Sequence, residues 1–443
     1  MKNKPANNSP KKKKKIILGI ILTLVLCYAG YLYFCVPMQF ESHYPESLEP
    51  LSPETMLTKE QVEEDRIKAI QFVEDVHPYF VLVKDRNEYE IAKQKYVETT
   101  QTGMSVFDFQ AATSEYLCFF SDGHTHIWWD EEKYILLDQT YQNGKTYLVE
   151  NQEVTDKWIT KMGEIPIEEI YKTIDSVIPA ENDMAVMINR TNYIVGQNML
   201  KLAGAKIHDS NITIEFSDGS LVDYPFYTLS NSPVQAYENL PNSCRMEEDI
   251  FVVDFNQCTY DDNLKAIAEK LEKEIQQGCT KVIIDARGNG GGDSLACTRL
   301  LKAMGMEEPN YSIFIRYSKE AKEQCGYLRA HGSYKNSPSV QNKTNDAIHL
   351  VVLCDKYTFS SATMLCVFVK DGRLGTLIGE PSSNMPSNYG DILYLSLPNS
   401  HLFASVSHKQ FIRPNGDITT RMLLPDIQTE PEDAYSKALE YLK

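Results

Sequence analysis

The chain has 443 residues, 42% of them hydrophobic and 24% charged, which is enough for two or three globular domains. Acidic residues outnumber basic residues by 61 to 44, for a formal net charge of −17. This acidic balance argues against a nucleic-acid partner, which would need a basic surface. The ten cysteines lack the paired spacing of a zinc site, so we expect no metal and no other cofactor.

The N-terminus joins a basic run to an apolar run. Five lysines, Lys11–Lys15, precede the twenty uncharged residues Ile16–Cys35, enough to cross about 30 Å of hydrocarbon as a helix. A cleaved signal peptide is the alternative, but its shorter apolar part would end in small residues rather than in the bulky Tyr31–Phe34. We therefore expect a basic cytoplasmic tail over 1–15 and a transmembrane helix over 16–36. The protein would be a single-pass protein of the cell membrane with an extracytoplasmic ectodomain.

The next residues predict a spacer and then a helical segment. Four prolines punctuate a polar stretch over 37–55, which we interpret as a stalk that holds the ectodomain off the membrane. An N-terminal helical segment over 56–135 follows, with a capping box at its start. Its helices are expected at 58–75, 87–100 and 106–120.

The remaining chain divides into an insert and an α/β core. Residues 136–235 predict short strands and one clear amphipathic helix at Glu168–Val177, which suggests a binding or spacer module. From 236 to 443, strands alternate with helices, which predicts right-handed crossovers and a largely parallel sheet. Two units of strand, turn and helix stand out there, over 282–304 and 350–369.

The turns of these two units carry candidate chemistry. Gly288–Gly292 has four glycines in five residues, which lets bare N–H groups approach a ligand closely. Ser360 lies at the start of the second helix, where it could simply cap the helix or could act as a nucleophile. Parallel strands place both turns at one sheet edge, so Ser360 would face two sources of oxyanion donors, the glycine turn and the Ser361 amide.

Several motifs together carry a family resemblance. They are Asp285-x-Arg-Gly-Asn-Gly-Gly-Gly, Thr358-x-Ser-Ser-Ala, Gly372-Arg, Gly379-Glu-Pro and the earlier turn Asp122-Gly-His-Thr. Their order resembles that of the C-terminal processing (tail-specific) proteases and their tricorn-core relatives, over most of residues 56–443. Residues 159–170 resemble the end of a PDZ-like insert. The resemblance implies a crotonase-like core that hydrolyses peptide bonds.

The resemblance also implies roles for individual residues. Ser360 matches the nucleophile, and the amides of Gly290, Gly291 and Ser361 match the oxyanion hole. The processing proteases pair the serine with a lysine about 25 residues later, where this chain has Met385, so their dyad cannot operate here.

The tricorn branch uses a histidine instead of the lysine, and His124 matches it. A neutral imidazole can take the serine proton, so activity is expected to fall below about pH 6.5. The acid that orients the histidine lies late in that branch, and Asp417 is the nearest candidate. His126, two residues after His124, should be dispensable.

These inferences predict a membrane-anchored extracytoplasmic serine peptidase that hydrolyses peptide or protein substrates by a Ser-His mechanism. The alternative, kept open by the absent lysine, is an inactive relative that binds peptides or cell-envelope partners. Labelling of Ser360 by a fluorophosphonate probe would separate the two.

Overall fold

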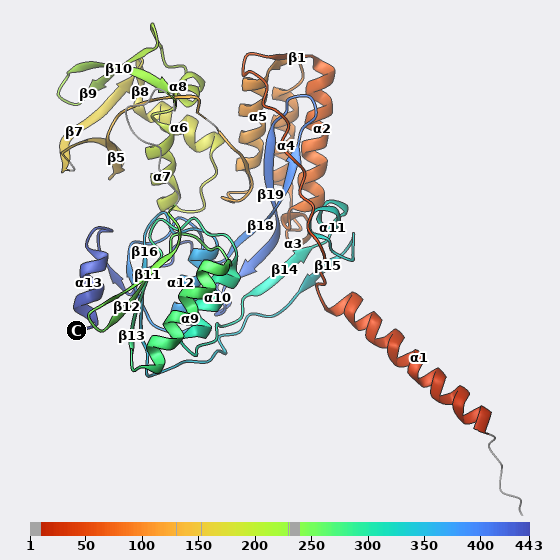
Figure 1. Ribbon diagram of the computed structural model, residues 1–443. Helices are drawn as coiled ribbons and strands as arrows, with labels where there is room; N and C mark the ends of the chain where they lie inside the picture. The colour runs from red at the N-terminus through yellow and green to blue at the C-terminus, as the bar shows by residue number, and fades with distance from the viewer. Residues whose placement is uncertain (1–9, 130, 152, 229, 231–239) are drawn as a thin grey trace, which may run out of the picture.

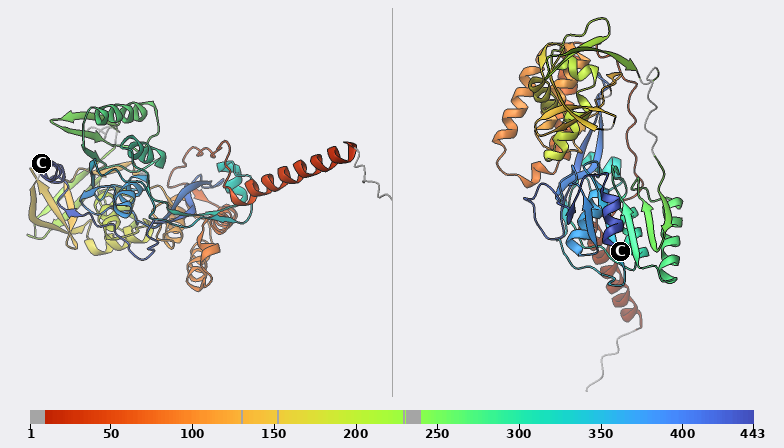
Figure 2. Two further views of the ribbon diagram at one scale, coloured as in Figure 1. Left: turned by 90° about the horizontal axis from the view of Figure 1, so that it is seen from below. Right: turned by 90° about the vertical axis from the view of Figure 1, so that its left-hand side faces the viewer.

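The computed structural model describes residues 10–443 except 130, 152, 229 and 231–239 (Figure 1). Most of the predicted tail over 1–15 therefore lies outside the described residues. Helix α1 (Pro10–Cys35) projects away from the body in all three views (Figures 1 and 2). Within the part of the chain that the structure describes, no helix combines the length and the apolar character needed to cross a membrane.

The proline-containing segment after α1 is bound along the body. The N–H of Phe40 donates to the carbonyl of Gly326 at 3.0 Å. The ring of Tyr44 meets the ring of Tyr394 edge-on, with 5.4 Å between centroids. The expected stalk is therefore docked beside helix α11 (Lys319–Cys325) instead of forming a free spacer.

The helical segment forms as the sequence predicts. Thr58 and Gln61 form the capping box at its start. Its helices pack on one another and on apolar residues of a distant sheet, including Leu393 and Val406. The elements of this segment are β1 (Met56–Leu57), α2 (Lys59–Val76), α3 (Tyr79–Leu82), α4 (Asn87–Thr99), β2 (Met104–Ser105) and α5 (Val106–Cys118).

The insert is an antiparallel sheet covered by helices, and it stands beside the helical segment in Figure 1. The predicted amphipathic helix buries Ile170 and Ile174 against the sheet. Helix α7 has no counterpart among the expected helices. The elements are β4 (Lys133–Ile135), β5 (Gln139–Gln142), β6 (Lys145–Glu150), β7 (Glu153–Met162), β8 (Ile165–Pro166), α6 (Ile167–Val177), α7 (Asp183–Tyr193), α8 (Gln197–Leu202), β9 (Asn211–Phe216) and β10 (Leu221–Thr228).

The core sheet has the order β11-β12-β13-β16-β17-β20, and all neighbours except β11 and β12 are parallel. Helices α9, α10 and α12 cover one face, and α13 covers the other. The elements are β11 (Ser243–Glu247), β12 (Ile250–Asp254), α9 (Asp262–Gln276), β13 (Lys281–Asp285), α10 (Ser294–Ala303), β16 (His349–Cys354), α12 (Ser361–Gly372), β17 (Thr376–Gly379), β20 (Ile427–Gln428) and α13 (Ala434–Tyr441).

A second, antiparallel sheet connects the core to the helical segment. The β18–β19 hairpin runs up toward α2 and α5 (Figure 1). The sheet consists of β3 (His126–Ile127), β14 (Ser312–Arg316), β15 (Ser333–Lys335), β18 (Asn388–Ser396) and β19 (Phe403–Ile412).

The prediction of a largely parallel sheet is correct only for the core sheet. Across the described residues, most strand pairs are antiparallel, because the insert and the second sheet contain antiparallel pairs alone. Short hairpins can join only antiparallel strands, whereas parallel strands need a long crossover. The sequence pattern around α9 and α12 provides such crossovers in the core.

Candidate active site

The nucleophile candidate lies in a strained turn between β16 and α12. Ser360 has φ 52° and ψ −123°, a conformation that a residue with a side chain rarely adopts. Its N–H donates to the side-chain oxygen of Asn384 at 3.0 Å, and Thr358 anchors the turn by donating its hydroxyl to the carbonyl of Ala286. The Ser360 hydroxyl does not cap α12, because it forms no hydrogen bond with the first amides of the helix. The turn therefore leaves this hydroxyl available for other contacts.

The glycine turn packs directly against this nucleophile. A Cβ on Gly291, which has φ 99°, would lie 2.6 Å from the Cβ of Ser360. The N–H of Phe359 also donates to the carbonyl of Asn289 at 2.9 Å, which ties the two turns together. The expected meeting of the two turns at one sheet edge is thus present, and only glycine fits at Gly291.

The predicted oxyanion donors differ in how they are placed. The Ser361 N–H opens α12, where a helix leaves its first amides without intrahelical acceptors. The N–H of Gly291 instead donates to the side chain of Asn289 at 2.9 Å. Gly290 is exposed, has an ordinary φ and would accept a Cβ without contact, so it lacks the backbone constraint that the sequence suggested.

The predicted base reaches the nucleophile from a remote part of the chain. The Nε2 atom of His124 lies 3.1 Å from the Ser360 hydroxyl oxygen. The His124 ring also packs on Phe359, with 4.8 Å between ring centroids. β19 holds the histidine from behind, because Ser405 donates its hydroxyl to the His124 carbonyl at 2.7 Å. The spacing between imidazole and hydroxyl suits proton transfer.

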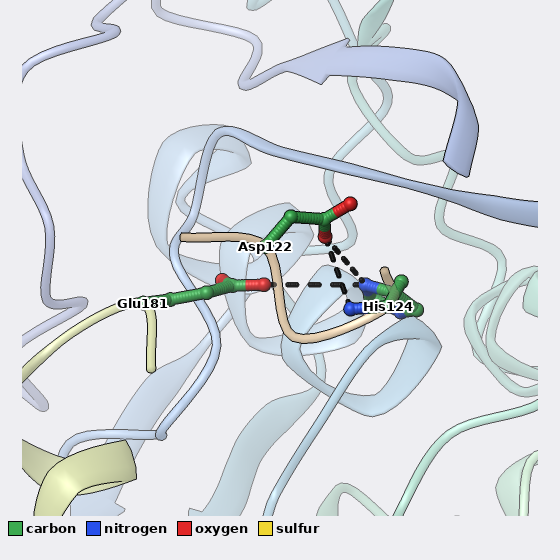
Figure 3. A group of neighbouring side chains, drawn as sticks. All are labelled: Asp122, His124 and Glu181. Atoms are coloured by element: carbon green, nitrogen blue, oxygen red, sulfur yellow. Dashed lines mark hydrogen bonds and ion pairs between the residues drawn. The ribbon is translucent and has the colours of Figure 1, made fainter. Parts of the chain in front are cut away.

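Two carboxylates approach the other nitrogen of the imidazole (Figure 3). The Nδ1 atom of His124 lies 3.7 Å from Asp122 and 4.0 Å from Glu181. Nδ1 is buried, and it forms no hydrogen bond with any of the described residues. Such contacts are often long without substrate and tighten when it binds.

The acid expected to orient His124 is elsewhere. Asp417 lies in a surface turn, where its carboxylate accepts the N–H groups of Thr419 and Thr420. The prediction of Asp417 as the partner of His124 is therefore wrong in position, because the local turn already satisfies that carboxylate. Asp122 and Glu181 occupy the place beside the imidazole instead.

Asp122 is held rigidly in the turn that carries His124. One of its oxygens accepts the hydroxyls of Thr125 and Ser407, each at 2.6 Å. His77, on the far side, places its Nε2 3.5 Å from the same carboxylate. Burial opposes the charge, but the neighbouring imidazoles of His124 and His77 hold the pKa of Asp122 well below its usual range. Asp122 is therefore the permanently charged acid of the site.

Glu181 comes from the insert, between α6 and α7. It accepts the N–H of Gly123 at 3.0 Å, the N–H of Met385 at 2.7 Å and the amide of Asn384 at 2.7 Å. Burial raises the pKa of Glu181 to about 7; the charge of His124 opposes this rise, and the charge of Asp122 adds to it. The insert thus supplies a titrating group to the site.

The protonation of His124 follows from these neighbours. Burial disfavours the charged ring, but the nearby carboxylate of Asp122, with the charges of Glu181 and Asp391, outweighs burial and raises the pKa of His124 above 6.5. His126 behaves differently, since burial and then the charge of His124 lower its pKa to about 4. Only His124 therefore combines contact with Ser360 and a pKa suited to a base.

Asp122, His124 and Glu181 are also a potential set of metal ligands, with ligand atoms within 4.8 Å of one another. Each of their carboxylate oxygens already accepts at least one N–H or O–H group of the protein. The histidine also directs its second nitrogen at Ser360. This arrangement fits carboxylates that orient an imidazole better than a metal centre.

Residues 249–429 match the model of peptidase family S41. This part of the chain carries the sequence pattern of that family. It contains the glycine turn and Ser360, while His124 and Glu181 come from outside it. The protein is a serine peptidase.

Solved structures with the same fold include mature CPAF, with a TM-score of 0.56 and 13% identity, over 86% of this chain and 96% of that one. Mature CPAF complexed with lactacystin has a TM-score of 0.55 and 13% identity, over 87% of this chain and 97% of that one. The photosystem II D1 C-terminal processing protease has a lower TM-score of 0.43, with 14% identity over 85% of this chain and 94% of that one. Among curated protein sequences, none matches this S41 chain.

Sequence reasoning missed three residues of the S41 site. Asp122 lies two residues before His124 in the same short turn, and this spacing could have identified it as the acid beside the histidine. Glu181 and Asn384 carry no such signal, because neither lies in a motif and their roles depend on how the insert docks on the core.

Proposed function

We propose that this S41 peptidase cleaves peptide bonds with Ser360 as nucleophile and His124 as general base. The observation that supports it best is the 3.1 Å contact between the imidazole Nε2 and the Ser360 hydroxyl. A serine hydroxyl is a weak nucleophile unless an adjacent base takes its proton. With Met385 in the position where the resemblance implies the dyad lysine, no other described side chain in contact with Ser360 can do this.

The reaction would proceed in two halves. Ser360 attacks the peptide carbonyl carbon as His124 takes the hydroxyl proton, and the oxyanion forms near the Ser361 N–H and the glycine turn. The C–N bond then breaks, and His124 returns the proton to the leaving amine. A water molecule, deprotonated by His124, attacks the acyl group, and Ser360 regains its proton as the acid product leaves.

The two carboxylates would share the task of orienting the imidazole. Asp122 is charged and stabilises the imidazolium that forms during attack. Glu181 adds a second carboxylate at the same nitrogen, and it also holds Asn384, whose oxygen accepts the Ser360 N–H. Glu181 is thus a positioning residue for both partners of the pair.

A cavity next to this pair offers a place for one substrate side chain. It has a volume of about 240 Å³, and its walls include Gly123 and Phe359, which flank His124 and Ser360. The apolar part of the remaining lining is Ile127, Ile178, Pro179, Ala185 and Ile188, and the polar part is His126, Glu181, Asn189, Tyr193 and Ser383. We expect peptides with an apolar residue at the cleavage site to be cut faster than peptides with a charged residue there.

The test of the catalytic proposal is covalent labelling. A fluorophosphonate probe should label the full chain and should fail to label the Ser360→Ala variant, while Ser361→Ala remains labelled. Peptide cleavage should disappear with the labelling. A folded protein that takes no label and cleaves no peptide would support the inactive, peptide-binding alternative.

We further propose that α1 anchors the protein in the cell membrane with the body outside. The support is the sequence, in which Lys11–Lys15 precede the uncharged run Ile16–Cys35. The side chains of Ile16, Phe34 and Cys35 in that run are not among those that the structure describes. Protease added to intact cells should remove the body and spare an N-terminal tag; a digested N-terminal tag would overturn the topology.

A further inference from the structure

A second cavity lies behind the catalytic acid, on the opposite side from Ser360. It has a volume of about 620 Å³ and opens where α3, the start of α4 and the end of α5 meet β18. His77 forms part of its wall, and the other side of that ring faces Asp122. The cavity is therefore separate from the peptide-cleaving site but shares one residue with its supporting shell.

Aromatic rings form most of the wall. The ring of Tyr79 lies 5.5 Å from Phe119 and 5.7 Å from Phe120, measured between centroids. The ring of His77 lies 4.4 Å from Phe120 and 4.6 Å from Tyr389. Tyr79, Phe119 and Tyr389 are only half-buried, so parts of their rings remain open to an occupant. Aromatic faces carry negative potential and attract cations.

Two acids complete the lining. Asp85 and Glu88 are exposed at the cavity, and neither forms an ion pair within the described residues. The neighbouring Arg86 does not neutralise them, because its guanidinium donates to the carbonyls of Phe80 and Val83. The cavity thus presents aromatic faces together with unpaired negative charge.

The environment of Tyr79 agrees with this charge. Burial raises the pKa of the Tyr79 hydroxyl, and the charges of Glu88, Asp85 and Glu90 raise it further, while Arg86 opposes them. Three acids against one base make the cavity mouth electronegative, so a cation would be drawn to it.

We propose that this cavity binds the arginine side chain of a peptide. A guanidinium is planar, so it can stack on Tyr79 or Phe119 while its N–H groups donate to Asp85 and Glu88. It is also weakly hydrated, which lowers the cost of entering an aromatic cavity. The bound arginine would lie against Phe120 and Tyr389, whose rings pack on the fully buried ring of His77. A shift of these rings would reach Asp122 through His77.

The experiment uses the full chain with Ser360→Ala, ¹³C-labelled at histidine, and Nα-acetyl-argininamide as the probe. The histidine NMR signal of His77 should shift and saturate as the probe is added. The signal of His349, at the start of β16 in the core sheet, should not move. Nα-acetyl-citrullinamide, which has the same shape without the charge, is the matched ligand.

Variants locate the binding. Asp85→Asn with Glu88→Gln should weaken arginine binding at least tenfold, whereas the matched surface pair Glu153→Gln with Glu269→Gln should leave it unchanged. Phe119→Leu, which keeps the apolar surface and removes one ring, should weaken it about 2–5-fold. Equal binding of the citrulline compound, an unmoved His77 signal or full affinity in the first double variant would each overturn the proposal.

Discussion

Met385 donates its backbone N–H to the carboxylate of Glu181 at 2.7 Å. Met385 stands where related proteases place a dyad lysine, so a residue without a titrating side chain occupies that position here. The partner in this contact titrates instead, because burial raises the pKa of Glu181 to about 7. The ionisable group in contact with this loop therefore comes from the insert.

Ser360 and His124 should behave as one catalytic unit. Ser360→Ala and His124→Ala should each lower kcat by roughly 10⁴-fold or more, and the double variant should be no worse than either, because effects within one unit are not additive. Peptide hydrolysis measured by mass spectrometry tests this. His126→Ala is the control and should retain turnover in a folded sample; loss of turnover there would contradict the assignment.

Asp122 rather than Asp417 should be the acid that matters. Asp122→Asn removes the charge facing the His124 imidazole and should lower kcat by roughly 10²–10⁴-fold. Asp417→Asn keeps an oxygen for its own surface turn and should change kcat less than about twofold. The two variants should be compared at a pH where the wild-type rate is constant. A larger loss of kcat in Asp417→Asn than in Asp122→Asn would show that Asp417 is the acid that orients His124.

The acid limb of the pH profile should lie above pH 6.5, not below it. Peptide hydrolysis requires neutral His124, and its raised pKa means that activity is lost at a higher pH as the pH falls. Glu181→Gln removes one of the charges that raise this pKa, so the limb of kcat/KM should move to lower pH. Glu164→Gln, at an exposed acid paired with Lys206, is the matched control. An unmoved limb in Glu181→Gln would show that Glu181 does not act on His124.

Gly291 and Gly290 should respond differently to a methyl group. Gly291→Ala places a Cβ 2.6 Å from the Ser360 Cβ at φ 99°, and we expect turnover to fall roughly 10²–10³-fold. Gly290→Ala meets nothing within 4 Å and should leave the Tm unchanged. Full kcat in a folded Gly291→Ala protein would rule out the close packing of the two turns.

The sequence was sufficient for the parts of the site that depend on local chain geometry. Ser360, the glycine turn and His124 each lie in a short motif, and parallel-strand topology brings the first two together. Glu181 could not be found in this way, because it reaches His124 only through the docking of the insert. The constrained position within the glycine turn, Gly291, could not be identified either, because φ cannot be assigned within a run of glycines.

The same limit applies to the fold. Buried β-branched runs separated by helices predicted the parallel core sheet correctly. The antiparallel partners of β14 and β3 were not predictable, because each pairs with β19, about 100 or more residues later in the chain. Pairing between such distant strands depends on tertiary packing that local patterns do not encode.

The docked segment that follows α1 bears on where an anchored enzyme could act. Gln39 already forms a β-bridge with Tyr327, four residues after α1 ends at Cys35, and four extended residues reach at most about 14 Å. With α1 in a bilayer, such a tether would give the active site almost no vertical travel. The enzyme would then select peptide bonds by their distance from the lipid surface as well as by their sequence.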